Sequence, residues 1–538
     1  MKEVYQEAEK LYNARIMIIY QNGDIETINR EQEWYVGLGK SCGRFSYKNE
    51  LITLVGREKE KEWLLDFLNM SGNFAISAIT GRAGNGKSSL VYSFYKNQIE
   101  ENEWYVIGVS YEGINGLLMK EIMARSRVLL IIDYVLVYAD EIGTWLKKLW
   151  GVIDDKADIK VRVLLIERAH VIENREPYWY SALVKKHDLE EVCPYKNFLK
   201  LEDLEENDLK KIFLAYIKQY GSEKDSQESD KVVDKIFDEI DETCKTPLFV
   251  LYIAQAWLDD KKRNIRRWNR EDLLTYVEKK EERRIELLFS EENAEEAKSL
   301  KKILVFSMML SGIELGKGLP RFLEKEFEIV KKAITPQKTS VKNLFRDVGR
   351  FSAKEVHFGS ALPEIVEEFY CLNYLKFYQD NSEEYLIEEI VNDAWKENSQ
   401  AFTGFLCRTI EDFSSHEMVA FDGILLMPDE NVINRVLYAD VVREYTYWKT
   451  EVDEYFEDVI CIFEKLLKTA KAEEEYDIRE KYAIALFNVI WNSCECDEIE
   501  HCVLAERKLK ILSKEGSDID EIYRYSKIKL LEEKIFIE

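Results

Sequence analysis

The order of apolar and polar residues between residues 54 and 205 predicts a parallel β-sheet covered by helices. Short runs of apolar, β-branched residues are each followed by a longer segment with an apolar residue at every third or fourth position. The first pattern is typical of strands buried on both faces, and the second of amphipathic helices. Strands that alternate with helices are the arrangement that a parallel sheet requires. The predicted strands are 74–80, 104–109, 128–133, 161–166 and 197–201.

The pattern differs on either side of this region. Two apolar runs, 16–20 and 25–28, flank an Asn-Gly pair and predict a β-hairpin. After residue 205, helical periodicity dominates, with a short strand at 354–358 and long, paired helices towards residue 538 that resemble a repeat. The first helices expected there are 204–220, 231–243 and 248–257.

A glycine-rich loop joins the first predicted strand to a helix. Residues 81–88 read Gly-Arg-Ala-Gly-Asn-Gly-Lys-Ser and fit G-x-x-x-x-G-K-[ST], the phosphate-binding loop. Its glycines allow a tight turn whose N–H groups face one anion, and the dipole of the following helix adds positive potential there. Lys87 is expected to reach the β- and γ-phosphates, and Ser88 to bind Mg²⁺. The other residues expected at the nucleotide are Gly81, Gly84, Asn85, Gly86 and Ser89.

An aspartate ends the third predicted strand. The apolar run 128–132 leads directly into Asp133. Because ligands of such sheets bind at the carboxyl ends of the strands, Asp133 is expected to hold Mg²⁺ beside Ser88. The alternative is a carboxylate that caps the next helix.

Composition limits the classes of function. The chain has 538 residues, is 46% hydrophobic and has only 7 prolines, which predicts several packed and mainly helical domains. A net charge of −26 argues against a surface that coats nucleic acid. Local basic segments at 261–267 and 331–354 keep nucleic-acid binding open there, although a solvated helix end is the simpler interpretation of the first.

The cysteines and the apolar runs bear on the compartment. Residues 1–15 are charged and predict a helix rather than a signal peptide, and no run approaches the length of a membrane span, so a cytoplasmic protein without membrane contact is expected. The 9 cysteines lack paired spacing, which predicts reduced thiols. The cluster Cys494, Cys496, His501 and Cys502 lacks zinc-site spacing and is interpreted as helix packing, with a metal site as the alternative.

These features resemble the STAND class of P-loop ATPases, the switch proteins that include NB-ARC and NACHT regulators. The likeness covers roughly residues 54–375, with Gly81–Ser88 as its Walker A motif and Leu129–Asp133 as its Walker B strand. Residues 55–58, Val-Gly-Arg-Glu, resemble the entry motif of the class. The resemblance implies that Gly56 and Arg57 approach the adenine end of the nucleotide.

Weaker motifs follow in the same order as in that class. Residues 164–168 resemble the sensor strand, whose arginine, here Arg168, reads the γ-phosphate. Residues 246–248 resemble the Gly-x-Pro-Leu motif, in which the proline, here Pro247, packs on adenine. Residues 361–368 resemble the closing helix of the winged-helix part. His357 lies where a winged-helix histidine contacts the β-phosphate of ADP in some members, with a core histidine as the alternative.

The chain departs from that class at three positions. Tyr134 stands where members usually have a second carboxylate that positions the attacking water, and Asp140 or Glu141 would lie a helical turn or more away. Hydrolysis is therefore expected to be slow or absent. Lys245 replaces the glycine of the Gly-x-Pro-Leu motif. Glu167 precedes Arg168, so Arg168 has a carboxylate as an alternative partner.

The expected fold class is an α/β P-loop nucleotide-binding domain with a parallel sheet, followed by helical, winged-helix-like and all-α, repeat-like domains. The residues before it form an adaptor with a β-hairpin. The expected boundaries are 1–53 for the adaptor, 54–205 for the P-loop domain, 206–295 for the helical domain, 296–378 for the winged helix and 379–538 for the C-terminal helices.

The resemblance implies an ATP-dependent switch that binds ATP or ADP with Mg²⁺ and hydrolyses slowly. Its C-terminal helices would sense a trigger, and open protomers would oligomerise and signal to a separate effector, for example in antiphage defence. Two alternatives stay open. One is an AAA+-like loader whose winged helix binds DNA, and the other is an ATP-binding scaffold without hydrolysis.

Overall fold

A computed structural model describes most of the chain, in two compact units. The described residues are 16–19, 25–28, 51–102, 104–109, 116–133, 135–154, 156, 158–168, 178–259, 268–288, 294–314, 319–333, 349–352, 357–360, 362–413, 434–449, 452, 455–495, 499–513 and 517–532. The first unit comprises Met1–Lys302, Glu314–Leu319 and Lys325–Val366, and the second the remaining ranges up to Glu538. Among the described helices, none is both long and apolar enough to cross a bilayer.

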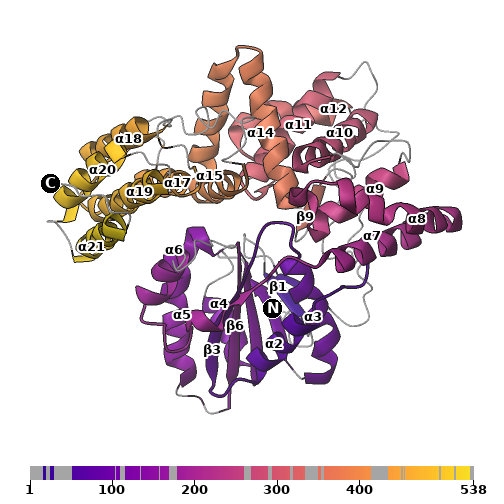
Figure 1. The fold of residues 1–538 in the computed structure, drawn as a ribbon, viewed down its shortest axis with the longest axis horizontal. Helices are drawn as coiled ribbons and strands as arrows, with labels where there is room; N and C mark the ends of the chain where they lie inside the picture. The colour runs from indigo at the N-terminus through magenta and orange to yellow at the C-terminus, as the bar shows by residue number, and fades with distance from the viewer. Residues whose placement is uncertain are drawn as a thin grey trace, which may run out of the picture. The chain divides into compact units, whose positions relative to one another are not determined.

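A seven-stranded sheet runs through the part of the first unit up to β7, with helices on both of its sides (Figure 1). The strand order is β2-β1-β4-β5-β6-β3-β7, and neighbours from β1 to β7 along this order pair in parallel. All the strands predicted within residues 54–205 are confirmed, and they occupy β3 Phe74–Thr80, β4 Tyr105–Val109, β5 Arg127–Asp133, β6 Lys160–Glu167 and β7 Leu199–Lys200. The last is shorter than predicted because it pairs with β3 only at two positions.

Strand β6 lies between the strand that precedes the glycine loop and the strand that ends in Asp133. Thr80 of β3 pairs with Glu167 of β6, and Asp133 of β5 pairs with Ile166. The carboxyl ends of β3, β6 and β5 therefore lie side by side at one edge of the sheet. This edge is where a doubly wound sheet binds its ligands.

The predicted N-terminal hairpin is confirmed, and it belongs to this sheet. Strand β1 (Ile16–Ile19) pairs antiparallel with β2 (Ile25–Ile28) and parallel with β4. The sequence predicted the hairpin but not this partner, because alternation within a hairpin carries no information about the edge to which it pairs.

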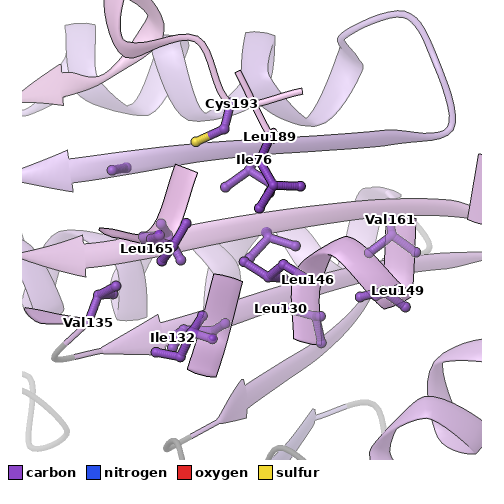
Figure 2. Packing of buried hydrophobic residues seen from close by; sticks show 14 of the residues in the cluster. Ile76, Leu130, Ile132, Val135, Leu146, Leu149, Val161, Leu165, Leu189 and Cys193 are labelled. Carbon is purple, nitrogen blue, oxygen red and sulfur yellow. The ribbon is translucent and has the colours of Figure 1, made fainter. Parts of the chain in front are cut away.

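Two hydrophobic cores cover the two faces of the sheet, since successive strand residues point to opposite faces. On one face, Ile76, Leu130 and Leu165 pack with Leu146 and Leu149 of α5 (Figure 2). Each such aliphatic side chain, fully buried, contributes about 1.5–3 kcal/mol. The opposite face packs against α2 and α3. The helices of this part are α2 Glu58–Asn69, α3 Lys87–Asn102, α4 Gly116–Met123, α5 Ala139–Asp154 and α6 Tyr178–Tyr180.

A buried arginine of the interior strand β6 caps the C-terminal end of helix α2. Arg162 is fully buried, yet its guanidinium donates to the carbonyls of Phe67 (3.1 Å), Met70 (2.5 Å) and Gly72 (3.1 Å). Carbonyls in the last turn of a helix lack intrahelical partners, so a cation there is stabilising. Burial lowers the pKa of Arg162 to about 10, so the side chain stays charged at neutral pH.

Helices follow the sheet, as predicted, but one has different bounds. The helix predicted at 231–243 is present as α8, but it begins earlier and ends earlier, at Glu223 and Glu239. It begins early because Ser222 and Asp225 form a capping box, each accepting a backbone N–H of the other. The helices of this region are α7 Glu206–Tyr220, α8 Glu223–Glu239, α9 Pro247–Asp259 and α10 Arg270–Leu288.

A small antiparallel element comes next. A three-stranded sheet has the order β8-β10-β9. The strand predicted at 354–358 overlaps β10 only at its last two residues, and 353–356 lie outside the described residues. The elements are α11 Ala294–Met309, β8 Ile313–Glu314, α12 Glu324–Ala333, β9 Gly349–Ser352, β10 His357–Ser360 and α14 Glu364–Asp380.

From Glu367 onward the second unit is helical where it is described. Its long helix α15 is interrupted at Asn398, whose φ of −152° and ψ of 84° are not helical. Helix α19 packs against α17, α20 and α21. The helices are α15 Glu384–Phe413, α17 Arg435–Trp448, α18 Phe456–Thr469, α19 Glu475–Glu495, α20 Ile499–Leu512 and α21 Ser517–Glu532.

Candidate functional site

The glycine loop between β3 and α3 depends on glycine at two positions. Gly84 and Gly86 have φ of +80° and +87°, a conformation that strains residues with a Cβ. A Cβ on Gly84 would also lie 3.2 Å from Oγ1 of Thr246 and 3.4 Å from Cβ of Leu248. The loop conformation that the motif predicted is therefore present.

Hydrogen bonds of the Arg57 and Asn85 side chains connect this loop to the segment after β7. The buried Arg57 guanidinium donates to the backbone carbonyls of Asn85 (3.2 Å) and Glu202 (2.9 Å) and pairs with Glu60 (2.8 Å). The Asn85 amide nitrogen donates to Oδ1 of Asp203 at 2.8 Å. The structure thus places Arg57 against the backbone of the phosphate loop, while its contact with adenine stays a prediction.

Gly56 and Gly81, two further residues predicted at the nucleotide, pack closely against α7 and the segment after β7. A Cβ on Gly56 would lie 2.5 Å from Oδ2 of Asp208 in α7, and one on Gly81 would lie 3.1 Å from the carbonyl oxygen of Leu201. Gly81 therefore has little room for a side chain, whereas Gly56 is favoured mainly by its left-handed φ of +68°. The segment before α2 and the segment after β7 come together around the loop.

Lys87, the first residue of α3, turns its ammonium back over the loop. Its Nζ donates to the carbonyl of Gly81 and, at 3.2 Å, to that of Arg82. Ser88 and Ser89 follow in the first turn of α3, both half-buried. Backbone N–H groups in a first helical turn lack intrahelical acceptors, so this turn presents donors to an anion.

The Glu167 carboxylate accepts hydrogen bonds from two backbone N–H groups, one after Asp133 and one at Arg168. Glu167 ends β6 and is 5% exposed. Its Oε2 accepts a hydrogen bond from the Leu136 N–H at 2.8 Å, and its Oε1 accepts one from the Arg168 N–H at 2.7 Å. The sequence had raised Glu167 only as a side-chain partner of Arg168, and periodicity gave no sign of its backbone contacts.

Replacing Glu167 by alanine should destabilise the first unit by roughly 2–5 kcal/mol, because two buried N–H groups would lose their acceptor. Urea unfolding followed by tryptophan fluorescence measures the change, with Glu190→Ala as the control because Glu190 is exposed. Equal stability of the two variants would show that the Glu167 hydrogen bonds do not hold this edge together.

Asp140 binds two basic side chains of the segment that follows α6. Its carboxylate accepts from Nε2 of His187 at 2.6 Å and from Nζ of Lys186 at 3.1 Å. Burial alone would raise the pKa of Asp140, but these hydrogen bonds and the nearby charges lower it below its ordinary value. The sequence considered Asp140 as a substitute for the acid missing at position 134. In the structure its carboxylate is bound to two basic side chains instead.

Arg168 pairs with the first residue of α14. Its Nη2 lies 3.6 Å from Oε2 of Glu364, and the Arg168 side chain is 4% exposed. The sequence singled out both residues, in separate motifs, but no local pattern relates positions so far apart along the chain. The sequence considered Glu167 as the carboxylate partner of Arg168. Glu167 instead accepts two backbone N–H groups, and the Arg168 side chain pairs with Glu364, which the sequence did not indicate as a partner.

The N-terminus of α9 contacts the phosphate loop. Pro247 is its first residue, and the Leu248 N–H donates to the carbonyl of Gly84 at 3.2 Å. Lys245, in the place of the motif's glycine, pairs with Glu242 (2.7 Å) and Glu206 (3.1 Å). The hydrogen bond to Glu242 raises the pKa of Lys245, so its charge is kept at neutral pH. Packing of Pro247 on adenine stays a prediction.

The residues at this edge fit a magnesium nucleotide. Two buried polar atoms beside the loop, Oδ1 of Asn85 and Oγ1 of Thr246, have no hydrogen-bond partner within the described part of the chain. Buried polar atoms are nearly always paired, so these two indicate a place where a polar ligand fits. The loop amides and Lys87 would hold phosphates, and Ser88 with Asp133 would supply oxygen ligands to Mg²⁺.

The strand order decides the fold. Strand β6 lies between β3, which leads into the glycine loop, and β5, which ends in Asp133, so the order is β7-β3-β6-β5-β4. The first unit has a P-loop nucleotide-binding fold.

His357 was also predicted at the site. It begins β10 opposite Ser352, and its side chain lies outside the described part. Its contact with ADP stays a prediction.

Three solved structures are similar to this chain at low sequence identity and low TM-score. The ORC1 protein of Aeropyrum pernix, in complex with DNA, is 11% identical over 60% of this chain and 93% of that one, with a TM-score of 0.29. Cdc6p from Pyrobaculum aerophilum is 14% identical over 60% and 96%, also with a TM-score of 0.29. Domain III of Thermotoga maritima DnaA is 15% identical over 43% and 95%, with a TM-score of 0.27. No protein-family model and no curated protein matches the sequence.

Proposed function

We propose that this protein is an ATP-binding molecular switch of the STAND class. The phosphate loop and Asp133 would bind ATP or ADP with Mg²⁺, and the C-terminal helices would sense a trigger. In the ATP state, protomers would assemble and signal to a separate effector, with antiphage defence as one setting. The absence of an acid at position 134, together with the engagement of Asp140, supports slow hydrolysis.

The ion pair between Arg168 and Glu364 is the observation that carries the switch. Arg168 follows β6 at the edge where the γ-phosphate is expected, and a buried guanidinium prefers a paired anion. Glu364 and the γ-phosphate are both anions, so they would compete for it. ADP would leave Arg168 with Glu364, whereas ATP would draw Arg168 away, and this difference in contacts is what a switch needs.

Helix α14 provides a path from this ion pair into the second unit. The helix begins at Glu364 in the first unit and continues from Glu367 onward in the second. One turn after Glu364, the buried Glu368 pairs with Arg408 of α15 at 3.2 Å. Release of Glu364 would therefore change the restraint on a helix that is anchored in the helical unit.

Replacing Glu364 by glutamine should speed the release of ADP, by about two- to fivefold, because a partly exposed ion pair contributes at most about 1 kcal/mol. A stopped-flow chase of a fluorescent ADP analogue measures the rate. Glu388→Gln serves as the control because Glu388 is exposed on α15. The Arg168→Gln variant and the double variant should release ADP no faster than Glu364→Gln alone.

Equal release rates for Glu364→Gln and the control would contradict the switch, and the nucleotide site would then remain without its proposed regulation. Single-turnover hydrolysis separates the switch from the scaffold alternative. Phosphate released slowly on addition of ATP supports the switch, and no phosphate, even at long times, supports the scaffold.

A loader that binds DNA is the second candidate, and the basic segment 331–354, which includes β9 of the three-stranded sheet β8-β10-β9, favours it. The basic residues Lys338, Lys342, Arg346 and Lys354 lie outside the described residues. Titration with duplex DNA at several salt concentrations decides. Binding that falls steeply as salt rises supports the loader, and no binding at low salt rejects it.

A further inference from the structure

Two cysteines touch in the core of the second unit. Cys494 lies in the last turn of α19, and Cys502 lies in the first turns of α20. Their sulfur atoms are 3.6 Å apart, which is van der Waals contact. Cys494 is 7% exposed and Cys502 is fully buried.

The two thiols contact each other and one backbone carbonyl. Sγ of Cys502 lies 3.7 Å from the carbonyl oxygen of Ile490, to which it donates, so the Cys494 thiol is the donor between the two sulfurs. The adjacent His501 packs its ring edge-on against Phe456, at 4.8 Å between centroids. Within the described residues there is no group of three potential metal ligands, and Cys496 lies outside them.

We propose that Cys494 and Cys502 are a modification site at which a mild oxidant such as hydrogen peroxide forms a disulfide between α19 and α20. The sulfurs, now in contact, need to approach by about 1.5 Å to reach a disulfide bond of about 2.05 Å. This site is independent of the nucleotide chemistry proposed above.

The reaction begins at Cys494, the more exposed thiol. Cys494 gives up its proton, and its thiolate sulfur attacks one oxygen of the peroxide. The O–O bond breaks, and the departing hydroxide takes that proton, so sulfenic acid and water form. The sulfur of Cys502 then attacks the Cys494 sulfur, the S–O bond breaks, and the hydroxide leaves as a second water after taking the Cys502 proton. Two thiols have lost two electrons and two protons to one peroxide, which becomes two waters.

The disulfide closes a short loop across the α19–α20 junction. A cross-link removes conformations from the unfolded chain, and it therefore stabilises the folded state. Oxidation should thus raise the thermal midpoint of the second unit by several degrees, and a thiol reductant should reverse the change. Exposure to an oxidant would therefore increase the thermal stability of the second unit.

The full chain with Cys461→Ser is the protein for the test, because Cys461 is exposed and would react on its own. Peroxide treatment is followed by alkylation of the remaining thiols and digestion with a glutamate-specific protease. Cleavage after Glu495 and Glu500 separates Cys494, Cys496 and Cys502 into different peptides, so only a disulfide keeps two of them together.

The expected result is a peptide pair that links Cys494 to Cys502, reversed by reductant and accompanied by the rise in thermal midpoint. Cys494→Ala should abolish both, whereas Cys407→Ala, at another buried cysteine, should leave both intact. Unlinked peptides after peroxide treatment, or a link from Cys496 to Cys502, would overturn the proposal. A link without any rise in midpoint would overturn it as well.

Discussion

Replacing Lys87 by alanine should weaken ATP binding by roughly 100-fold or more, because charge-assisted hydrogen bonds to two phosphates would be lost, at about 1.5–3 kcal/mol each. In the structure the ammonium lies at the mouth of the loop, held by carbonyls of Gly81 and Arg82. Transfer of the ammonium from these neutral acceptors to phosphate favours binding. Isothermal titration calorimetry with ATP measures the loss.

A matched variant controls for charge and folding. Lys59→Ala removes a lysine from the exposed face of α2, and it should leave ATP affinity unchanged. Circular dichroism should give the same helix content for both variants and the unmodified protein. If Lys87→Ala binds ATP as tightly as Lys59→Ala does, the assignment of residues 81–88 as the phosphate loop is wrong.

Replacing Asp133 by asparagine should lower ATP affinity by about 10- to 100-fold when Mg²⁺ is present, and leave it unchanged in EDTA, because the variant loses only a carboxylate that supports the metal. The aspartate ends β5, beside the strand that Glu167 ends. The same titrations, with and without Mg²⁺, measure the ratio of the two affinities.

Asp66→Asn, an exposed aspartate of α2, is the control for this pair of titrations. Its ratio of affinities should equal that of the unmodified protein. An Asp133→Asn variant that keeps the full benefit of Mg²⁺ would remove Asp133 from the metal site, while the loop assignment would stand on Lys87 alone.

The strands and the glycine loop were predictable because their signals are local. Strand β3 has the predicted bounds, since a run of apolar residues before a glycine loop marks both ends of a buried strand. The left-handed glycines at 84 and 86 are a direct consequence of the motif. Where a helix begins at a side-chain cap, as α8 does at Ser222, periodicity alone missed the start.

The contacts that complete the site were not predictable, because they join distant parts of the chain. Neither the support of the loop by Arg57 nor the pairing of Arg168 with Glu364 leaves a pattern within a window of the sequence. The same holds for Arg162, a charge in a central strand that the apolar pattern would exclude but that the end of α2 satisfies. At each of these positions, the conformation of the buried side chain depends on a hydrogen bond or ion pair to a residue far away in the sequence.

A structure of the protein with Mg²⁺ and a non-hydrolysable ATP analogue tests the central claim most directly. The account predicts that the phosphates lie against the amides of residues 84–88, that Lys87 leaves the carbonyl of Gly81 for them, and that the metal lies between Ser88 and Asp133. An analogue bound elsewhere, or a loop in which Lys87 still donates to Gly81, would contradict it.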